Sequence, residues 1–185
     1  MCRSALLFGL CLASTAAFAD KAEQERQEIQ KIEKDTLAKL YSFQPGAKQA
    51  IERAAGYAVF SNFGMKILVA GGGSGKGVAV HRKTGARAYM RMGEIQTGVG
   101  MGVKKFQVVF VFETPEKLDA FINQGWEFGG QMTTAATTGG QGAALQGALS
   151  VSPGVWVYQL TDKVLAAEAT VKGTKYWKDA ALNKG

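Results

Sequence analysis

Apolar side chains follow a helical spacing near the N-terminus of this chain and a strand spacing further on. From Lys21 to Tyr41 they recur every three or four residues among charged ones, which predicts an amphipathic helix. Its acids and bases stand three or four residues apart, as on a solvated helix face. Pro45 and Gly46 interrupt the pattern, and a second, shorter helix is expected from Ala47 to Ala55, ending at Gly56.

The middle of the chain predicts an antiparallel meander, because short apolar runs alternate with glycine and lysine turns. Gly71–Gly75 is expected to be a flexible segment before it, and Gly85 to supply the positive φ of its first turn. The expected strands are Gly56–Phe60, Lys76–Arg82, Ala86–Met92, Gly98–Val103 and Phe106–Phe112, and the turns of the meander are Lys83–Gly85, Gly93–Thr97 and Lys104-Lys105.

A third helix is expected after the meander. Thr114 is a suitable N-cap and Pro115 suits the first helical position. The apolar stripe that should pack this helix on the sheet consists of Leu118, Phe121 and Ile122, and the helix should end before Gly125.

The C-terminal part predicts two last strands, Val155–Leu160 and Val164–Val171, followed by a polar tail with Tyr176 and Trp177. Before them, Gly129–Ser152 consists almost entirely of small and polar residues, which fit either strands or a loop. The whole pattern predicts an α+β fold: a mainly antiparallel sheet that could close toward a barrel, with the N-terminal helices and one internal helix packed on it.

The first residues have the features of a cleaved signal peptide. A weakly basic start precedes an apolar run from Ala5 to Ala17, and Ala17-Phe18-Ala19 provides an A-x-A cleavage site. We expect residues 1–19 to be removed on export and residues 20–185 to form one domain. Both cysteines, Cys2 and Cys11, lie in the expected leader, so the mature domain would depend on its core for stability.

Positive charge is concentrated in the meander. The chain has a net charge of +7, and the segment 64–106 holds eight basic residues against one acid, Glu94. Alternate turns of a meander share an end, so the first and third turns should lie together and Glu94 at the opposite end. Period-two spacing also puts Arg87, Tyr89 and Arg91 on one face.

The residues predicted to form one basic sheet edge are Arg82, Lys83, Arg87, Lys104 and Lys105. Such an edge attracts anions such as lipid head groups or nucleic acid. The alternative is that lysines at the turns only keep the sheet edges soluble.

No pattern in the chain predicts an enzyme or a cofactor. Gly71–Gly77 resembles a phosphate loop but lacks the hydroxyl residue after Lys76 and leads into a strand. His81 is the only histidine and the mature domain would lack cysteine, which argues against the usual zinc and iron–sulfur sites. A hydrolase would need a serine, His81 and an aspartate to meet in space, and no Gly-x-Ser-x-Gly motif supports this.

Several short motifs, in their order, resemble the SYLF lipid-binding family, most closely its exported bacterial branch. They are Gly56–Phe60, Gly71–Gly77, Gly77–Val80, the Arg82–Gly85 turn, Tyr89-Met90, Val108–Phe112, Gly125-Trp126, Gly173–Asp179 and Leu182-Asn183. The resemblance implies a non-catalytic module that binds phospholipids, which are phosphoinositides in eukaryotic members, some of which also bind actin filaments. Those members use a basic N-terminal helix for membrane contact, whereas Lys21–Tyr41 is charge-balanced here.

The expected function is peripheral binding of anionic phospholipid, of phosphoinositide type or bacterial, through the basic edge. The expected partner is a membrane surface. Actin and nucleic acid are not expected partners, since neither is met after export to a bacterial envelope. The alternative is a structural or assembly protein of the envelope that contacts a protein partner through Gly129–Ser152.

Overall fold

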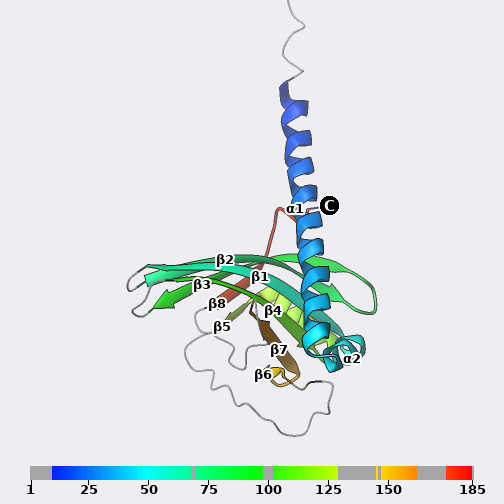
Figure 1. The fold of residues 1–185 in the computed structure, drawn as a ribbon. Coiled ribbons are helices and arrows are strands. Elements are labelled where there is room, and N and C mark those ends of the chain that lie inside the picture. The colour runs from blue at the N-terminus through cyan, green and yellow to red at the C-terminus, as the bar shows by residue number, and fades with distance from the viewer. Residues whose placement is uncertain are drawn as a thin grey trace, which may run out of the picture.

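The computed structural model describes residues 10–67, 70–97, 102–128, 145, 147–161 and 174–184, which form an α+β fold with one curved antiparallel sheet (Figure 1). The helices are α1 (Leu10–Phe43), α2 (Gly46–Arg53) and α3 (Pro115–Gln124). The strands are β1 (Gly56–Ile67), β2 (Ala70–His81), β3 (Arg87–Thr97), β4 (Gly102–Phe112), β5 (Trp126–Phe128), β6 (Leu149–Ser152), β7 (Val155–Leu160) and β8 (Thr174–Lys178). Their order across the sheet is β5-β8-β3-β2-β1-β4-β7-β6, which confirms the predicted fold class.

The predicted order of the meander is wrong at β4. The segments Gly98–Val103 and Phe106–Phe112 were expected as two strands. Residues 98–101 lie outside the described residues, and Gly102–Phe112 is one strand, which pairs with β1 instead of β3. Lys104 and Lys105 therefore lie within a strand and not in a turn. Neither lysine favours the positive φ of a tight hairpin turn, and the apolar run after them extends the pairing with β1.

The glycine-rich segment before the meander is also paired. Gly71–Gly75 was expected to be flexible, but it belongs to β2 and pairs with both β1 and β3. A Cβ at Gly77 would lie 2.4 Å from the Phe60 ring, and one at Gly75 would lie 2.6 Å from the Met92 side chain. The missing side chains leave room for large neighbours, which is why glycine is suited to this strand.

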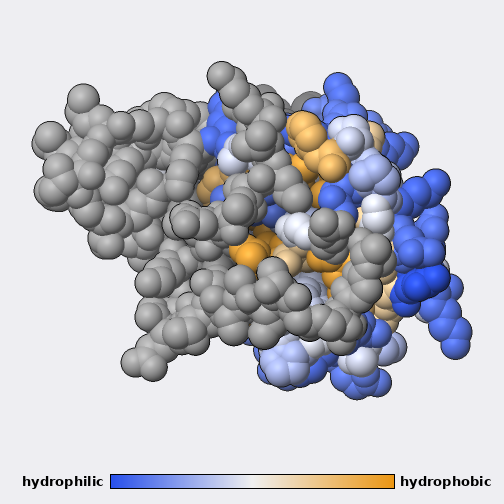
Figure 2. All heavy atoms as spheres, turned by 60° about the horizontal axis from the view of Figure 1, so that its bottom comes forward, coloured by the Kyte–Doolittle hydropathy of each residue, from blue (hydrophilic) through white to orange (hydrophobic). Residues whose placement is uncertain are grey.

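One face of the sheet, here called the inner face, carries an aromatic core. Phe60 of β1 packs edge-on against Phe110, Phe121 and Tyr176, with ring centroids 6.1, 6.1 and 4.8 Å away. Phe121 comes from α3, which begins at Pro115 as predicted and lays its stripe on this face. Figure 2 shows hydrophobic residues in the middle of the described part of the underside and hydrophilic residues along its rim.

The opposite, outer face is covered by α1 and α2. Ile29 and Leu40 of α1 and Ile51 of α2 are buried against outer-facing strand residues such as Val59 and Val109. The predicted helix Lys21–Tyr41 lies within α1, and α2 ends at Arg53, two residues before the predicted end, because the chain turns into β1 at Gly56. No helix among the described residues has the length and apolar character needed to span a bilayer.

The C-terminal tail is a strand. Residues 174–178 form β8 between β3 and β5, and Tyr176 is fully buried in the inner core, so the predicted polar tail is wrong. From Thr174 to Trp177 buried and exposed residues alternate, because successive side chains of a strand point to opposite faces of the sheet. Val164–Val171 and most of Gly129–Ser152 lie outside the described residues, and of the latter Leu149–Ser152 is β6.

Signal-peptide removal stays a prediction. The expected leader, residues 1–19, overlaps α1 from Leu10 onward, and the helix runs past Ala19 without a break (Figure 1).

Candidate functional site

The structure divides the five predicted binding residues between two ends of the sheet. Arg82 and Lys83 form the β2–β3 turn and Arg87 begins β3, all near Gly56 of β1. Lys104 and Lys105 stand opposite Gly64 and Phe63, eight and seven residues further along β1. Eight strand residues span about 26 Å. The prediction of a single basic edge is therefore wrong.

The position of Glu94 is corrected for the same reason. It was expected at the end opposite Lys104 and Lys105. Gly73 stands opposite Glu94 on one side and Gly64 on the other, and Gly64 stands opposite Lys104. Glu94 and Lys104 thus occupy the same end of the sheet, because β4 pairs with β1.

The predicted faces of β3 are confirmed. Arg87, Tyr89 and Arg91 lie on the outer face, whereas Ala88, Met90 and Met92 belong to the inner core. What the sequence did not predict is that α1 supplies partners for this face. Gln30 Nε2 donates to the Tyr89 hydroxyl at 2.8 Å.

Acidic residues of α1 neutralise the basic residues of the outer face. Glu28 pairs with Lys76 at 2.6 Å, and Glu25 pairs with Arg91 at 2.9 Å. Glu33 pairs with Arg87. Glu25 and Glu28 are one helical turn apart, and Glu33 follows about two turns after Glu25, so all three can reach the sheet from α1. This spacing was the available signal, but the neighbouring lysines and arginines of α1 suggested local pairs on a solvated face.

Glu33 is the most buried of these acids, with 4% of its side chain exposed. It accepts a hydrogen bond from the Tyr57 hydroxyl at 2.6 Å and another from Arg87. Burial, and then the bond to Glu33, raise the pKa of Tyr57 well above its usual range. Burial is the largest single cause and lowers the pKa of Arg87, but the bond to Glu33 and the charges of Glu33, Tyr57 and Tyr89 together raise it above its usual value. Both groups therefore keep their protons at any ordinary pH.

Arg91 is held between α1 and the C-terminal turn. Its Nε donates to Asp179 at 2.5 Å, and Asp179 also accepts backbone bonds from Ala181 and Leu182. The side chain of Arg26 reaches the same turn, donating to the carbonyls of Leu182 and Lys184. The turn thus joins α1 to β3, and Figure 1 shows the C-terminus beside α1.

The stability of the fold is expected to depend on the protonation of the Asp179 carboxyl group at acid pH. Burial raises its pKa, but the bonds from Leu182, Arg91 and Ala181 together lower it below the usual value of 3.8. A lowered folded-state pKa stabilises the fold above the unfolded pKa, and this contribution is lost as pH falls through the folded value. We expect the stability difference between the wild type and Asp179→Asn to shrink below about pH 4 in urea titrations. A difference that stays constant from pH 7 to pH 2 would contradict this.

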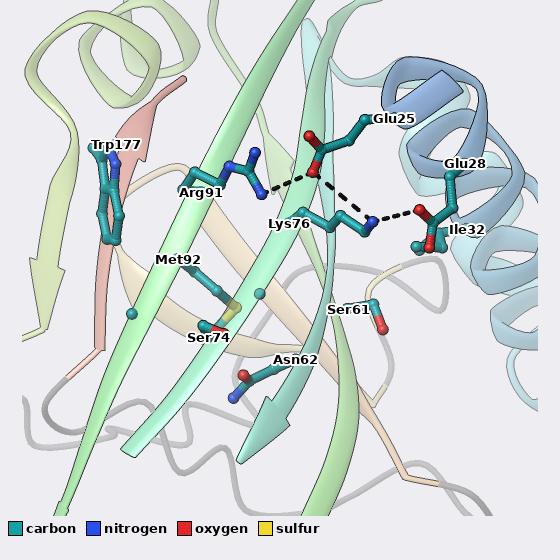
Figure 3. A pocket seen from close by; sticks show the side chains of 12 residues that line it. Glu25, Glu28, Ile32, Ser61, Asn62, Ser74, Lys76, Arg91, Met92 and Trp177 are labelled. Atoms are coloured by element: carbon teal, nitrogen blue, oxygen red, sulfur yellow. Dashed lines mark hydrogen bonds and ion pairs between the residues drawn. The ribbon is translucent and has the colours of Figure 1, made fainter. Parts of the chain in front are cut away.

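A pocket of about 460 Å³ opens between α1 and strands β1–β3, next to Trp177 (Figure 3). Lys76 and Arg91 lie in its centre, Glu25 and Glu28 on the α1 side, and the Trp177 indole on the far side. Among the described residues, histidines and acids do not gather in groups of three that could hold a metal ion.

A second group of cations remains without acidic partners. Arg82 and Lys83 in the β2–β3 turn and Arg53 at the end of α2 are exposed, and in the described ranges none of them makes an ion pair. The Arg82 amide donates to the Ala55 carbonyl at 3.0 Å, so the turn is fixed beside the end of α2. Arg53, Arg82 and Lys83 are called the turn cluster below. Arg53 was not predicted, since only the fold brings α2 to this turn.

Comparison with known proteins gives two matches. The model of the Ysc84 family, described as Las17-binding protein actin regulator, matches residues 93–185. Beta cell expansion factor A of Aeromonas veronii is 35% identical over 163 residues, covering 88% of this chain and 60% of that protein. The chain thus spans about 60% of the length of that relative.

The family match begins in β3 and includes the later motifs from which the resemblance was predicted, from Val108–Phe112 to Leu182-Asn183, whereas the motifs before residue 93 lie outside it. The chain therefore belongs to the Ysc84 family, the family of the SYLF domain, which is associated with lipid and actin binding.

Proposed function

We propose that this protein is a non-catalytic module that binds anionic phospholipid at a membrane surface through the turn cluster. The observation that supports this is that some cations of the sheet have acidic partners and others do not. Lys76, Arg87 and Arg91 are neutralised by α1, whereas Arg53, Arg82 and Lys83 project without acidic partners in the described part of the chain. Unpaired exposed cations are the ones available to an anionic surface.

The strength of such binding follows from charge. A basic residue near an anionic membrane contributes about 1 kcal/mol, so three of them give weak, reversible attachment. The attraction falls off within about 8 Å at physiological salt, so binding should weaken as salt is added. Lys104 and Lys105 lie too far along the sheet to join this cluster, and Arg87 lies beside it but is paired with Glu33.

The proposed location is the periplasm, after removal of residues 1–19, with the cluster turned toward a membrane leaflet. A lipid-associated family and an exposed basic turn support this, together with the A-x-A site in the sequence.

Neutralising the turn is expected to weaken membrane binding. The double variant Arg82→Gln, Lys83→Gln should bind phosphatidylglycerol vesicles about thirtyfold less tightly than the wild type, because two contributions to the attraction are lost. Flotation with anionic and with phosphatidylcholine vesicles, at low and high salt, measures this partition.

The matched control is Lys31→Gln, Lys34→Gln, which removes the same charge from exposed positions of α1. Equal losses in both variants would mean that net charge, not the turn, governs binding. Absence of any binding by the wild type would favour the assembly role, which light scattering would then test as a stable oligomer.

A further inference from the structure

The pocket beside Trp177 contains two cations that point toward the same carboxylate. Oε1 of Glu25 lies 2.9 Å from the Arg91 guanidinium and 3.9 Å from the Lys76 ammonium (Figure 3). Lys76 contacts Glu28 as well. An oxyanion held between an arginine fork and a lysine is also the arrangement in which proteins bind phosphate groups.

Arg91 would keep its position without Glu25. Its Nε is bound to Asp179 on the other side, and Asp179 is itself fixed by the amides of Ala181 and Leu182. Removal of the two α1 carboxylates would leave Lys76 and Arg91 facing the pocket with Asp179 behind, a net positive site. With α1 in place, Lys76 and Arg91 face three carboxylates, those of Glu25, Glu28 and Asp179, so the pocket does not attract an anion from a distance.

The part of α1 that supplies these carboxylates is held mainly by polar contacts. From Asp20 to Glu28 no side chain is fully buried, and Ile29 is the first that is. Glu28 is 60% exposed, and exposed ion pairs stabilise a fold by only about 0–1 kcal/mol each. After the proposed removal of residues 1–19 this segment is the N-terminal end of α1, and helix ends open locally at low cost. It can then leave the sheet, with loss of the Arg26 bonds to the C-terminal turn, while Ile29 and Leu40 stay packed.

Trp177 stands at the far side of the pocket with 42% of its surface exposed. A Cβ at Gly93 would lie 3.2 Å from its ring, so the glycine makes room for the indole above the sheet. An exposed indole suits the boundary between lipid head groups and water, because its ring is apolar and its N–H is polar.

We propose that this pocket is a second site, for the phosphate of a lipid head group, and that the Glu25 carboxylate occupies the phosphate position until the segment Asp20–Glu28 moves away. This inference rests on the proposed binding of anionic phospholipid. The turn cluster makes the first contact, and the head group then replaces Glu25 between Lys76 and Arg91 as Trp177 meets the membrane. The segment Asp20–Glu28 of α1 thus acts as a built-in competitor for the lipid.

Removing the competing carboxylates is expected to strengthen binding. The double variant Glu25→Gln, Glu28→Gln should partition onto phosphatidylglycerol vesicles about tenfold more strongly than the wild type, as freed cations near the surface each add attraction. Adding Lys76→Gln should abolish most of this gain. The control Glu23→Gln, Asp35→Asn removes the same charge from exposed positions away from the pocket. Circular dichroism verifies the fold of each variant.

Two results would overturn the proposal: no gain in the pocket variant, or an equal gain in the control. Inorganic phosphate tests the source of the anion through indole fluorescence, with Trp177→Phe as the reference. A phosphate response without any vesicle gain would assign the pocket to a free anion and overturn the lipid assignment.

The outcomes separate the two proposals. If the wild type floats through Arg82 and Lys83 but the Glu25→Gln, Glu28→Gln variant gains nothing, the pocket proposal fails and the turn cluster stands. If that variant binds in a Lys76-dependent way while the wild type does not float, the turn cluster fails and the pocket stands.

Discussion

Replacing Phe60 with alanine is expected to lower the free energy of unfolding by about 4 kcal/mol. Phe60 is fully buried in the central strand β1, and its ring contacts Phe110, Phe121 and Tyr176 from β4, α3 and β8. Gly77 on the neighbouring strand has no side chain that could fill the space left by the ring. In a domain of this size the loss corresponds to a fall in melting temperature of about 12 °C.

Phe43→Ala provides the control, because Phe43 is 44% exposed. Its removal should change the free energy of unfolding by no more than about 0.5 kcal/mol. Urea unfolding followed by circular dichroism measures both. Similar costs for the two variants would show that the aromatic cluster is not the centre of the core.

Replacing Glu33 with alanine is expected to cost about 3 kcal/mol, the lower end of the range for breaking a buried ion pair. The buried Tyr57 hydroxyl would lose its acceptor and Arg87 its counter-charge. The lower end applies because the Arg87 side chain is 35% exposed, so water can solvate part of its charge.

Glu28→Ala is the matched control on the same helix. It removes a carboxylate that also contacts a sheet cation, Lys76, at 2.6 Å, but from an exposed position. A cost of about 0.5 kcal/mol is expected there. If urea unfolding gave an equal loss in the free energy of unfolding for both variants, burial of Glu33 would not be what stabilises the packing of α1 on the sheet.

The elements predicted correctly from the sequence are those governed by neighbours along the chain. The start of α3 follows from Thr114 and Pro115, and its buried stripe from the spacing of Leu118, Phe121 and Ile122. The two faces of β3 follow from period two. In these cases the signal lies within one helix or one strand, so no knowledge of distant partners is needed.

The predictions that failed depend on partners far away in the chain. The glycines of β2 form a strand because Phe60 and Met92 occupy the space that side chains would need. Lys104 lies in a strand because β4 pairs with β1, some forty residues earlier. Neither relation is visible in the local spacing of residues. The prediction of a single basic edge failed because it placed Lys104 and Lys105 in a turn.

The residues of the candidate sites also divide into those that local sequence predicts and those that depend on distant partners. The exposed pair Arg82 and Lys83 was predicted because the turn is local. The neutralisation of Lys76, Arg87 and Arg91 was not predicted, because their acidic partners lie on α1, between 48 and 66 residues earlier in the chain. The local lysine and arginine neighbours of those acids offered equally good partners in the sequence.

The C-terminal segment makes contacts with α1 and β3 that can form only after most of the chain has been synthesised. The Arg26 side chain donates to the Leu182 carbonyl, 156 residues further along the chain. Strand β8 pairs with the edge of β3 that faces away from β2. A nascent chain emerges N-terminus first, so β3 has an open hydrogen-bonding edge until Thr174–Lys178 arrive. An open strand edge is a template for pairing with other chains. Pairing of β8 with β3 therefore removes an edge at which the unfinished sheet could pair with other chains.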